Sequence, residues 1–519
     1  MPPTLARLSA ALVLLATSAL AAATPTVLTL SADKPGPVIN RNIYGQFSEH
    51  LGRCIYDGIW VGKDSPIPNT NGYSNEVLAA LRDLHVPLLR WPGGCFADDY
   101  HWRDGIGPMD KRPSLYNANW GGVVENNHFG THEFLDLCEM LGIEPYVCVN
   151  VGSGTVQEAK EWVEYMTSDA TSPMANLRRA NGRDKPWKVH FLAIGNEAWG
   201  CGGSMTPEFY ADNFRRYNTY IRNYAARPED AVYRVACGAS GNDYQWTETL
   251  MKRVGQQMNG ISLHSYTIPS GQWKTKGSAT EFGIPQYYET LSQTLQMEEY
   301  VTRHSAIMDK YDPAKKVGLC VDEWGIWTDV EKGTNPAFLY QQNSMRDAIL
   351  AALNLHIFQE HADRVVMANI AQMVNVLQAM LLTDKAKVVR TPTYHVFEML
   401  SVHQGATALP VALSTPYLPA QTDVKIPNVS ASASRDSAGR IHLSLVNTDA
   451  EHPVEVSCTV QGAALRQPTG RVLTADAVNA HNTFEAPDAV SPKAFSGATV
   501  SGNLLKIELP AMSVVVLEL

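Results

Sequence analysis

Residues 189–200 read VHFLAIGNEAWG, and this stretch decides how the rest of the chain is interpreted. It begins as an apolar run of strand length, and it ends in Gly-Asn-Glu before the glycine-rich turn 200–203, GCGG. A buried strand tolerates a carboxylate only where that group is paired or lies at an open end. Glu197 is therefore expected where a strand emerges into a loop, which is where barrel enzymes carry their chemistry.

A second stretch has the same form. Residues 317–325 read VGLCVDEWG, an apolar strand that ends on Glu323 and is followed by Trp and Gly. A single strand-end glutamate is most often a surface residue in a salt bridge. Two in matching contexts indicate a pair of carboxyl groups that act together on one bond.

The middle of the chain alternates strand-like and helix-like segments. Eight strands with helices between them, over residues 43–395, predict a (β/α)8 TIM barrel, an α/β fold. A doubly wound sheet would also alternate, but it usually brings a glycine-rich phosphate loop, and no such motif is found. Residues 174–188 are polar and are expected to form a solvated loop, as are residues 270–284. The strands are expected to begin near Ile43, Val86, Glu144, Val189, Tyr233, Gly260, Lys316 and Arg364.

After residue 395 the pattern changes to short alternating runs separated by turn residues. Residues 396–519 therefore predict an all-β domain, a C-terminal sandwich. The short apolar run 26–30 has no local partner, so residues 24–42 are expected to supply an N-terminal strand that joins this sandwich.

The N-terminus has the pattern of a targeting segment. Arg7 precedes an apolar run at 8–16, and small residues follow to Ala23. This predicts a signal peptide at 1–23 and an exported protein, periplasmic or extracellular. A membrane anchor needs about 20 apolar residues, which neither this segment nor any later one provides, so no membrane partner is expected after cleavage.

Composition narrows the function classes. The 519 residues are 45% apolar and 18% charged, as in an ordinary globular protein, and the net charge of −10 disfavours nucleic acid as a partner. The eight cysteines and scattered histidines show no metal-ligand spacing, so neither a metal nor another cofactor is expected. Disulfide pairing stays open, as does the choice between a monomer and a homo-oligomer.

The sequence resembles the α-L-arabinofuranosidases of glycoside hydrolase family 51 over nearly the whole chain after residue 23. The resemblance rests on Gly-Asn-Glu, on VDEWGIW at 321–327, and on further runs in the expected order. These are IYGQFSEHLGR at 43–53, LRWPGGCF at 89–96, FGTHEF at 129–134 and NIAQMVN at 369–375.

The resemblance implies a retaining mechanism, which needs two carboxyl groups about 5–5.5 Å apart. Glu197 would be the general acid/base at the end of the fourth strand, and Glu323 the nucleophile at the end of the seventh. Asn196 and Glu49 would bind sugar hydroxyls. Tyr266 would hold the nucleophile or simply pack. Arg90 would keep a carboxylate ionised or form a structural ion pair. Cys95 and Gln372 match positions in the furanose pocket, and Trp120 and Trp327 match its aromatic walls.

The expected activity is exo-acting removal of terminal α-L-arabinofuranosyl residues from arabinoxylan, arabinan or derived oligosaccharides, which would be the protein's partners. Related barrels act as β-xylosidases or endo-glucanases, and an open groove in place of a closed pocket would favour these. A carbohydrate-binding protein without catalysis would have lost one glutamate, whereas Glu197 and Glu323 are both present.

Overall fold

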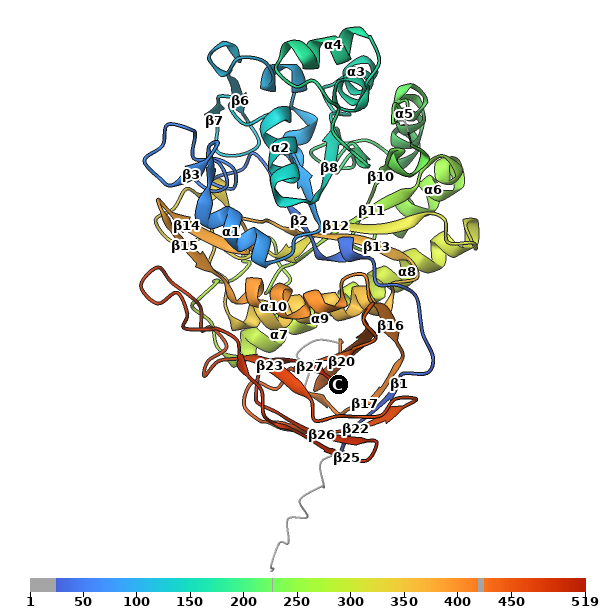
Figure 1. The fold of residues 1–519 in the computed structure, drawn as a ribbon, viewed down its shortest axis with the longest axis vertical. Helices are drawn as coiled ribbons and strands as arrows, with labels where there is room; N and C mark the ends of the chain where they lie inside the picture. Colours follow the sequence, from blue (N-terminus) through green and yellow to red (C-terminus); the bar gives the residue numbers. More distant parts are fainter. Residues whose placement is uncertain (1–24, 226, 419–423) are drawn as a thin grey trace, which may run out of the picture.

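The computed structural model describes residues 25–225, 227–418 and 424–519. A barrel with its helices stands on a β-sandwich, and a layer of helices lies between them (Figure 1). The predicted signal peptide lies outside the described residues. In the described part of the chain, no helix is both long and apolar enough to cross a membrane.

The barrel is closed and all of its strand pairs are parallel, which confirms the predicted fold class. Each strand begins within about two residues of the expected position, because apolar runs set the buried segments. In chain order the strands are β2 (Gly45–Phe47), β5 (Leu88–Trp91), β8 (Glu144–Val149), β9 (Phe191–Ile194), β10 (Tyr233–Ser240), β11 (Gly260–Thr267), β12 (Gly318–Ile326) and β13 (Val365–Ala371).

Side chains fill the barrel interior. Tyr146, Cys148 and Met367 are fully buried there, as expected for a packed barrel core. Close strand contact also needs glycine, since a Cβ on Gly238 would lie 1.6 Å from the carbonyl oxygen of Ser262 in the neighbouring strand.

Helices surround the strands and differ from the sequence prediction at one place. Residues 174–188 were expected to be a loop, but α4 (Pro173–Ala180) forms there and Arg178 is fully buried. The Arg178 guanidinium donates hydrogen bonds to the carbonyl oxygens of Tyr165 and Ser168, which makes its burial tolerable. The other helices are α1 (Asn75–Asp83), α2 (Thr131–Leu141), α3 (Val156–Thr167), α5 (Pro207–Tyr220), α6 (Tyr244–Val254), α7 (Ile284–Thr294), α8 (Gln296–Tyr311), α9 (Met345–Glu360) and α10 (Pro392–Leu400).

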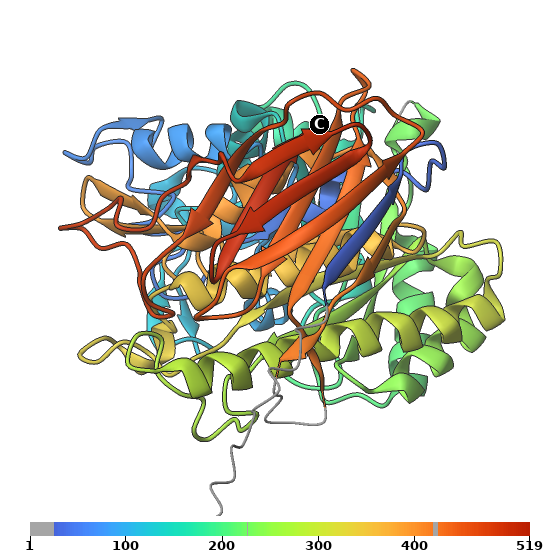
Figure 2. The same ribbon diagram turned by 90° about the horizontal axis from the view of Figure 1, so that it is seen from below.

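The C-terminal sandwich has two sheets, and Figure 2 shows the strands of its outer sheet from below. The five-stranded sheet has the order β17 (Val411–Ser414), β1 (Thr26–Ser31), β22 (Val454–Gln461), β26 (Leu504–Leu509), β25 (Ala498–Ser501). The six-stranded sheet has the order β16 (Thr407–Leu409), β20 (Val429–Arg435), β21 (Ile441–Asn447), β27 (Ser513–Glu518), β23 (Thr469–Thr474), β24 (Lys493–Ala494). Strand β1 lies parallel to β22 and antiparallel to β17, so the first described strand is part of this domain.

Helix α9 joins the two parts. All of its residues except Glu360 are buried, since it packs on β13 of the barrel and on β20, β21 and β27 of the sandwich. Its His356 lies 2.9 Å from the hydroxyls of both Ser430 and Ser444. Because α10 runs past residue 396, we propose that the division between barrel and sandwich falls after this helix.

Candidate active site

A cavity of about 400 Å³ opens where the barrel strands end. All of the predicted site residues line it except Arg90 and Asn196. Arg90 donates a hydrogen bond to Glu323, which lines the cavity, and another to Asn196. The lining residues are Glu49, Leu51, Cys95, Trp120, Glu197, Trp199, Ser240, His264, Ser265, Tyr266, Trp273, Glu323, Trp327, Leu339, Gln372 and Leu377.

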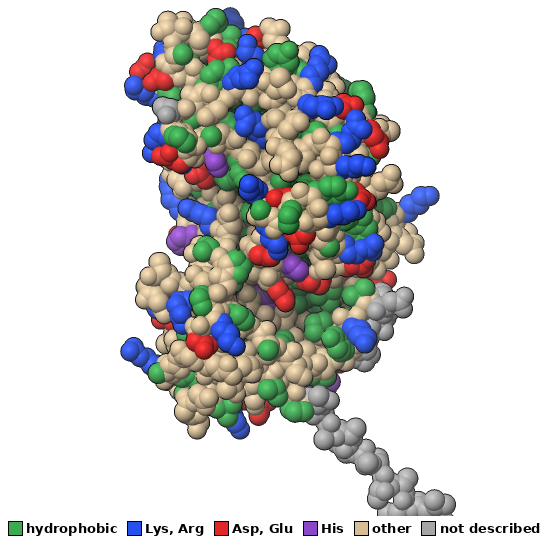
Figure 3. All heavy atoms as spheres, turned by 90° about the vertical axis from the view of Figure 1, so that its right-hand side faces the viewer, with side chains coloured by type: hydrophobic (Ala, Val, Ile, Leu, Met, Phe, Trp, Pro, Cys, Tyr) green, Lys and Arg blue, Asp and Glu red, His purple; other side chains and the backbone are tan. Residues whose placement is uncertain are grey.

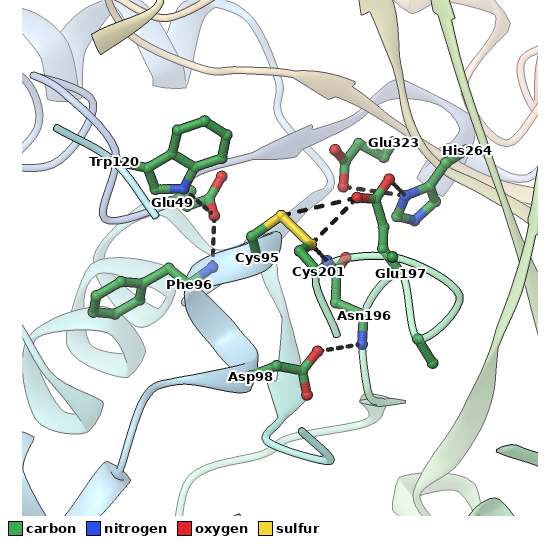
Figure 4. The surroundings of a disulfide bond; sticks show 12 residues. Glu49, Cys95, Phe96, Asp98, Trp120, Asn196, Glu197, Cys201, His264 and Glu323 are labelled. Atoms are coloured by element: carbon green, nitrogen blue, oxygen red, sulfur yellow. Dashed lines mark hydrogen bonds and ion pairs between the residues drawn. A yellow bond between two sulfur atoms is a disulfide. The ribbon is translucent and has the colours of Figure 1, made fainter. Parts of the chain in front are cut away.

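Glu197 follows β9 in a tight turn. Its φ of +37° lies in the left-handed region, which costs a residue with a side chain on the order of 1–3 kcal/mol. The turn is held by hydrogen bonds from the N–H groups of Gly200 and Gly202 to the Glu197 carbonyl, at 2.7 and 3.0 Å. Buried Asp98 accepts from the Asn196 N–H at 3.0 Å (Figure 4). These contacts aim the Glu197 carboxyl into the cavity.

A disulfide joins Cys95 to Cys201 beside this carboxyl (Figure 4). It links η2 (Cys95–Asp98), which follows β5, to the glycine-rich turn after Glu197. Oε2 of Glu197 lies 3.5 Å from the Cys201 sulfur and 3.9 Å from that of Cys95. A disulfide sulfur carries no proton to donate, so both contacts set a weakly polar wall against the carboxyl group.

Glu323 lies within β12, three residues before its end, and not at the strand end that the sequence predicted. Its Oε2 accepts from Arg90 Nη1 at 2.8 Å, and its Oε1 accepts from the Tyr266 hydroxyl at 2.6 Å. The Arg90 Nη2 donates to Asn196 Oδ1 at 2.5 Å. Arg90 therefore connects the turn that carries Glu197 to the strand that carries Glu323 from below the cavity, where it is fully buried.

His264 and Asp322 belong to the site, although the sequence interpretation passed over both. Nδ1 of His264 lies 3.0 Å from Glu197 Oε1 and 3.4 Å from Glu323 Oε2, and its Nε2 lies 3.2 Å from Asp322 Oδ1. Asp322 also accepts a hydrogen bond from Tyr146 at 2.7 Å. The sequence could have indicated His264, because it lies two residues from Tyr266 on one strand. Side chains two residues apart on a strand share a face, so both point toward the site.

Glu49 anchors the other end of the cavity. Its carboxyl accepts from Trp120 Nε1 at 2.8 Å, from the Phe96 N–H at 3.0 Å and from Gln372 Nε2 at 3.0 Å. Glu49 follows β2 and Gln372 follows β13, and these strands are neighbours in the barrel. The predicted residues Glu49, Trp120 and Gln372 are thus brought together as one hydrogen-bonded end wall.

The acid groups of the site sit in different environments. Burial, with the charge of Glu323 adding to it, raises the pKa of Glu197, although a hydrogen bond from His264 acts in the opposite direction. Burial and the charge of Glu323 raise the pKa of Glu49 to about 7. Burial would lower the pKa of His264, but the Glu323 charge and its bonds to Asp322 and Glu197 raise it to about 10. A glutamate of the site can therefore keep its proton near neutral pH, beside the ion pair of Arg90 and Glu323.

Metal ligation has two geometric candidates among the described residues. Cys95, Glu197 and Cys201 form one group and Glu197, His264 and Glu323 the other, each with possible ligand atoms within 4.8 Å of one another. The sulfurs of the first group are joined in a disulfide and offer no thiolate. The atoms of the second already bind one another or Arg90 and Tyr266. That no metal or cofactor is needed stays a prediction.

Comparison with known proteins identifies the family. Two family models match, "Alpha-L-arabinofuranosidase 1 domain" over residues 80–275 and "Alpha-L-arabinofuranosidase C-terminal domain" over residues 322–513. A protein of Bacteroides ovatus named "Intracellular exo-alpha-L-arabinofuranosidase" is 53% identical over 506 residues, 98% of each chain. The crystal structure of the GH51 arabinofuranosidase from Xanthomonas axonopodis pv. citri superposes with a TM-score of 0.93 at 52% identity, covering 95% of this chain and 99% of that one. The chain belongs to glycoside hydrolase family 51.

Two more distant relatives are also named as α-L-arabinofuranosidases. An α-L-arabinofuranosidase of Thermotoga maritima, solved as an arabinose complex, has a TM-score of 0.84 at 31% identity, covering 95% of this chain and 99% of that one. A "Probable alpha-L-arabinofuranosidase C" of Aspergillus terreus is 32% identical over 86% of this chain and 88% of its own. The family predicted from the sequence motifs is thus confirmed.

The comparisons contradict one prediction. The Bacteroides ovatus relative, aligned over nearly its whole length, is named intracellular, so the prediction of an exported protein is wrong. That prediction depended on the composition of residues 1–23 alone: a basic residue, an apolar run and small residues. Such a composition fits a leader but does not by itself specify export.

Proposed function

We propose that the protein is an exo-acting, retaining α-L-arabinofuranosidase. It removes terminal non-reducing α-L-arabinofuranosyl residues from arabinoxylan, arabinan or derived oligosaccharides. The observation that carries this proposal is the proximity of the two glutamates, since a carboxyl oxygen of Glu197 lies within 4.8 Å of one of Glu323. This spacing leaves no room for a water between carboxylate and sugar, as an inverting enzyme requires.

In the first step, Glu323 attacks the anomeric carbon while Glu197 protonates the departing glycosidic oxygen. The raised pKa of Glu197 supports the role of acid, and the fixed charge of Arg90 beside Glu323 supports a negatively charged nucleophile. The Tyr266 hydroxyl orients Glu323. In the second step Glu197, now ionised, takes a proton from water, and that water releases arabinose from Glu323 with retained configuration.

The end wall of the cavity supports exo action. Glu49, Trp120 and Gln372 join across it, so the pocket accepts one terminal sugar. In this assignment Glu49, Gln372 and Asn196 bind sugar hydroxyls, and Trp120, Trp327 and the Cys95 disulfide form walls. Figure 3 shows basic and acidic side chains mixed over one face of the barrel, as suits a neutral substrate better than a polyanion.

The test is the stereochemistry of the first product from an aryl α-L-arabinofuranoside, read by proton NMR before mutarotation. We expect α-arabinofuranose first, and methyl α-L-arabinofuranoside when methanol is present, because the alcohol intercepts the covalent intermediate. An initial β product would overturn the double displacement. Faster hydrolysis of aryl β-D-xyloside, aryl β-D-glucoside or a glucan would overturn the substrate assignment.

A further inference from the structure

The cavity has a second end, set by the strand order of the barrel. Glu49 and Gln372 follow β2 and β13, whereas Glu197, Ser240 and Ser265 come from β9, β10 and β11 on the opposite side. A general acid protonates the oxygen of the leaving group, so that group must lie on the Glu197 side. The residues at the ends of β9, β10 and β11 are therefore placed to contact the leaving group.

Trp273 lies in the loop that follows β11, and its exposure is unusual for a residue that lines a cavity. Its side chain lines the cavity, yet the residue is 58% exposed. Its ring centroid lies 5.3 Å from that of Trp327, at 81°, and Trp327 in turn lies 5.0 Å from Tyr266, which binds Glu323. A line of aromatic rings thus runs outward from the nucleophile, and Trp273 is its exposed outer member.

The loop that carries Trp273 is braced. The Ser270 hydroxyl donates to the Thr275 carbonyl at 2.5 Å, and the Gly277 N–H donates to Asp329 at 3.1 Å. The Lys276 ammonium lies 6.0 Å from the Trp273 ring and 5.9 Å from that of Trp327, so one cation contacts both indoles. These contacts fix an indole that is not used to fill the core.

Two unused hydroxyl groups complete this end. Ser240 and Ser265 both line the cavity, and within residues 25–225, 227–418 and 424–519 the Oγ of each has no hydrogen-bond partner. Aromatic faces with a few free polar groups are the usual composition of a sugar-binding surface, since the ring packs on C–H groups and the hydroxyls fix orientation.

We propose that Trp273 is the platform of a leaving-group subsite and stacks on the pyranose unit that carries the arabinofuranosyl residue. A pyranose chair presents a flat face of C–H groups to an indole, whereas a puckered furanose does not, so the subsite selects arabinose-substituted xylopyranosyl chains over arabinan. Ser240 and Ser265 donate hydrogen bonds to hydroxyls of that unit. This proposal depends on the proposed function, because it names the leaving group of the same reaction.

The test compares substrates that differ only in the leaving group. Relative to the wild type, Trp273→Ala should lower kcat/KM on arabinosylated xylo-oligosaccharides by about tenfold, as removal of a stacking anchor does. It should change kcat/KM on methyl α-L-arabinofuranoside by less than about twofold, because a methyl group reaches no platform. Trp273→Phe should restore part of the loss. Phe209→Ala, on α5 and 61% exposed outside the cavity, is the matched control.

The outcomes separate the two proposals. A wild-type protein inactive on every arabinofuranoside would overturn the proposed function itself. An active wild type whose Trp273→Ala variant loses equally on methyl arabinofuranoside and on xylo-oligosaccharides would overturn the subsite. If Trp273→Ala lowered kcat/KM on arabino-oligosaccharides as much as on arabinosylated xylo-oligosaccharides, the preference for a pyranose would be overturned. A loss on arabino-oligosaccharides alone would also overturn it.

Discussion

Arg90 Nη1 lies 2.8 Å from Oε2 of Glu323, and this ion pair is buried beneath the cavity. The same guanidinium reaches Asn196, so one side chain sets the distance between the turn that carries Glu197 and the strand that carries Glu323. A planar fork can serve both acceptors at once, whereas a lysine ammonium on a flexible stem cannot hold that geometry.

Arg90→Lys should lower kcat on an aryl α-L-arabinofuranoside by at least about tenfold and lower the melting temperature. Lysine keeps a positive charge beside Glu323, so the loss of stability should be smaller than the about 3–5 kcal/mol that follows when one buried charge is left alone. Steady-state kinetics and thermal unfolding measure the two effects. Arg303→Lys, in an exposed pair with Glu299, is the control, and equal effects at both positions would contradict the role of Arg90.

Glu197→Ala and Glu323→Ala should fail differently. Without Glu323, both steps are lost on every substrate. Without Glu197, aryl glycosides with good leaving groups should retain more activity, since they need little protonation, and added azide should restore turnover by attacking the glycosyl-enzyme. Rates on a series of aryl leaving groups check this. The same loss for both variants across the series would show that the roles are wrongly assigned.

The charge of His264 should stabilise the folded protein in a defined pH range. Burial opposes the charge, but the surrounding carboxylates raise the pKa of His264 from about 6.5 to about 10. A pKa raised on folding gives stability that is complete below the unfolded value and is lost as pH rises through the folded value. The difference in melting temperature between wild type and His264→Gln should therefore shrink from pH 7 to pH 10. Phe209→Ala, at an exposed position without a titrating group, should show no such trend.

Reduction of the Cys95–Cys201 disulfide should shift the pH profile. It replaces two sulfurs without protons by thiols, and a thiol of Cys201 can donate to Glu197 Oε2 from 3.5 Å. A hydrogen bond to the charged form lowers a pKa, so Glu197 should lose its proton at lower pH. The basic limb of kcat/KM should then move to lower pH in dithiothreitol.

The double variant Cys95→Ala/Cys201→Ala has neither the bond nor the thiols. It should keep the basic limb where the oxidised enzyme has it, in the presence or absence of dithiothreitol. Thiol counting and mass spectrometry establish the redox state in each assay. A reduced enzyme with an unmoved basic limb would contradict the proposed effect of the sulfurs on Glu197.

Removal of residues 404–519 should yield a protein that aggregates or unfolds. Helix α9 is buried all round, and the truncation would expose its apolar side chains, such as Leu353 and Phe358, together with Leu28 of β1. Size-exclusion chromatography and circular dichroism check this. A soluble, active truncation that loses only polymer binding would show that the sandwich is an independent binding module.

Much of the barrel could be predicted because each strand is a short apolar run ended by turn residues. Gly-Asn-Glu after such a run was enough to place Glu197. His264 was missed because a histidine inside an apolar strand is more often a packed core residue, and only the fold brings Asp322 and both glutamates to it. The pairing of Cys95 with Cys201 could not be deduced either, since spacing along the chain does not define proximity.

The error at residues 174–188 has a different cause. Polar composition normally indicates solvent, but Arg178 is buried against backbone carbonyls that no pattern of side chains reveals. Trp273 was placed in a loop from its polar neighbours. The braced geometry of that loop and its contact with Trp327 depend on a segment more than fifty residues away in sequence.

Strand β1 has a consequence for how the chain is made. Its neighbours β17 and β22 are synthesised only after the entire barrel. Leu28 and Leu30 therefore lack the strands they pair with while most of the protein is being made. N-terminal domains usually fold first during translation, but here the first described strand belongs to the C-terminal sandwich. A message that ends early would leave this strand unpaired, and the nascent product would present an apolar edge to chaperones and proteases.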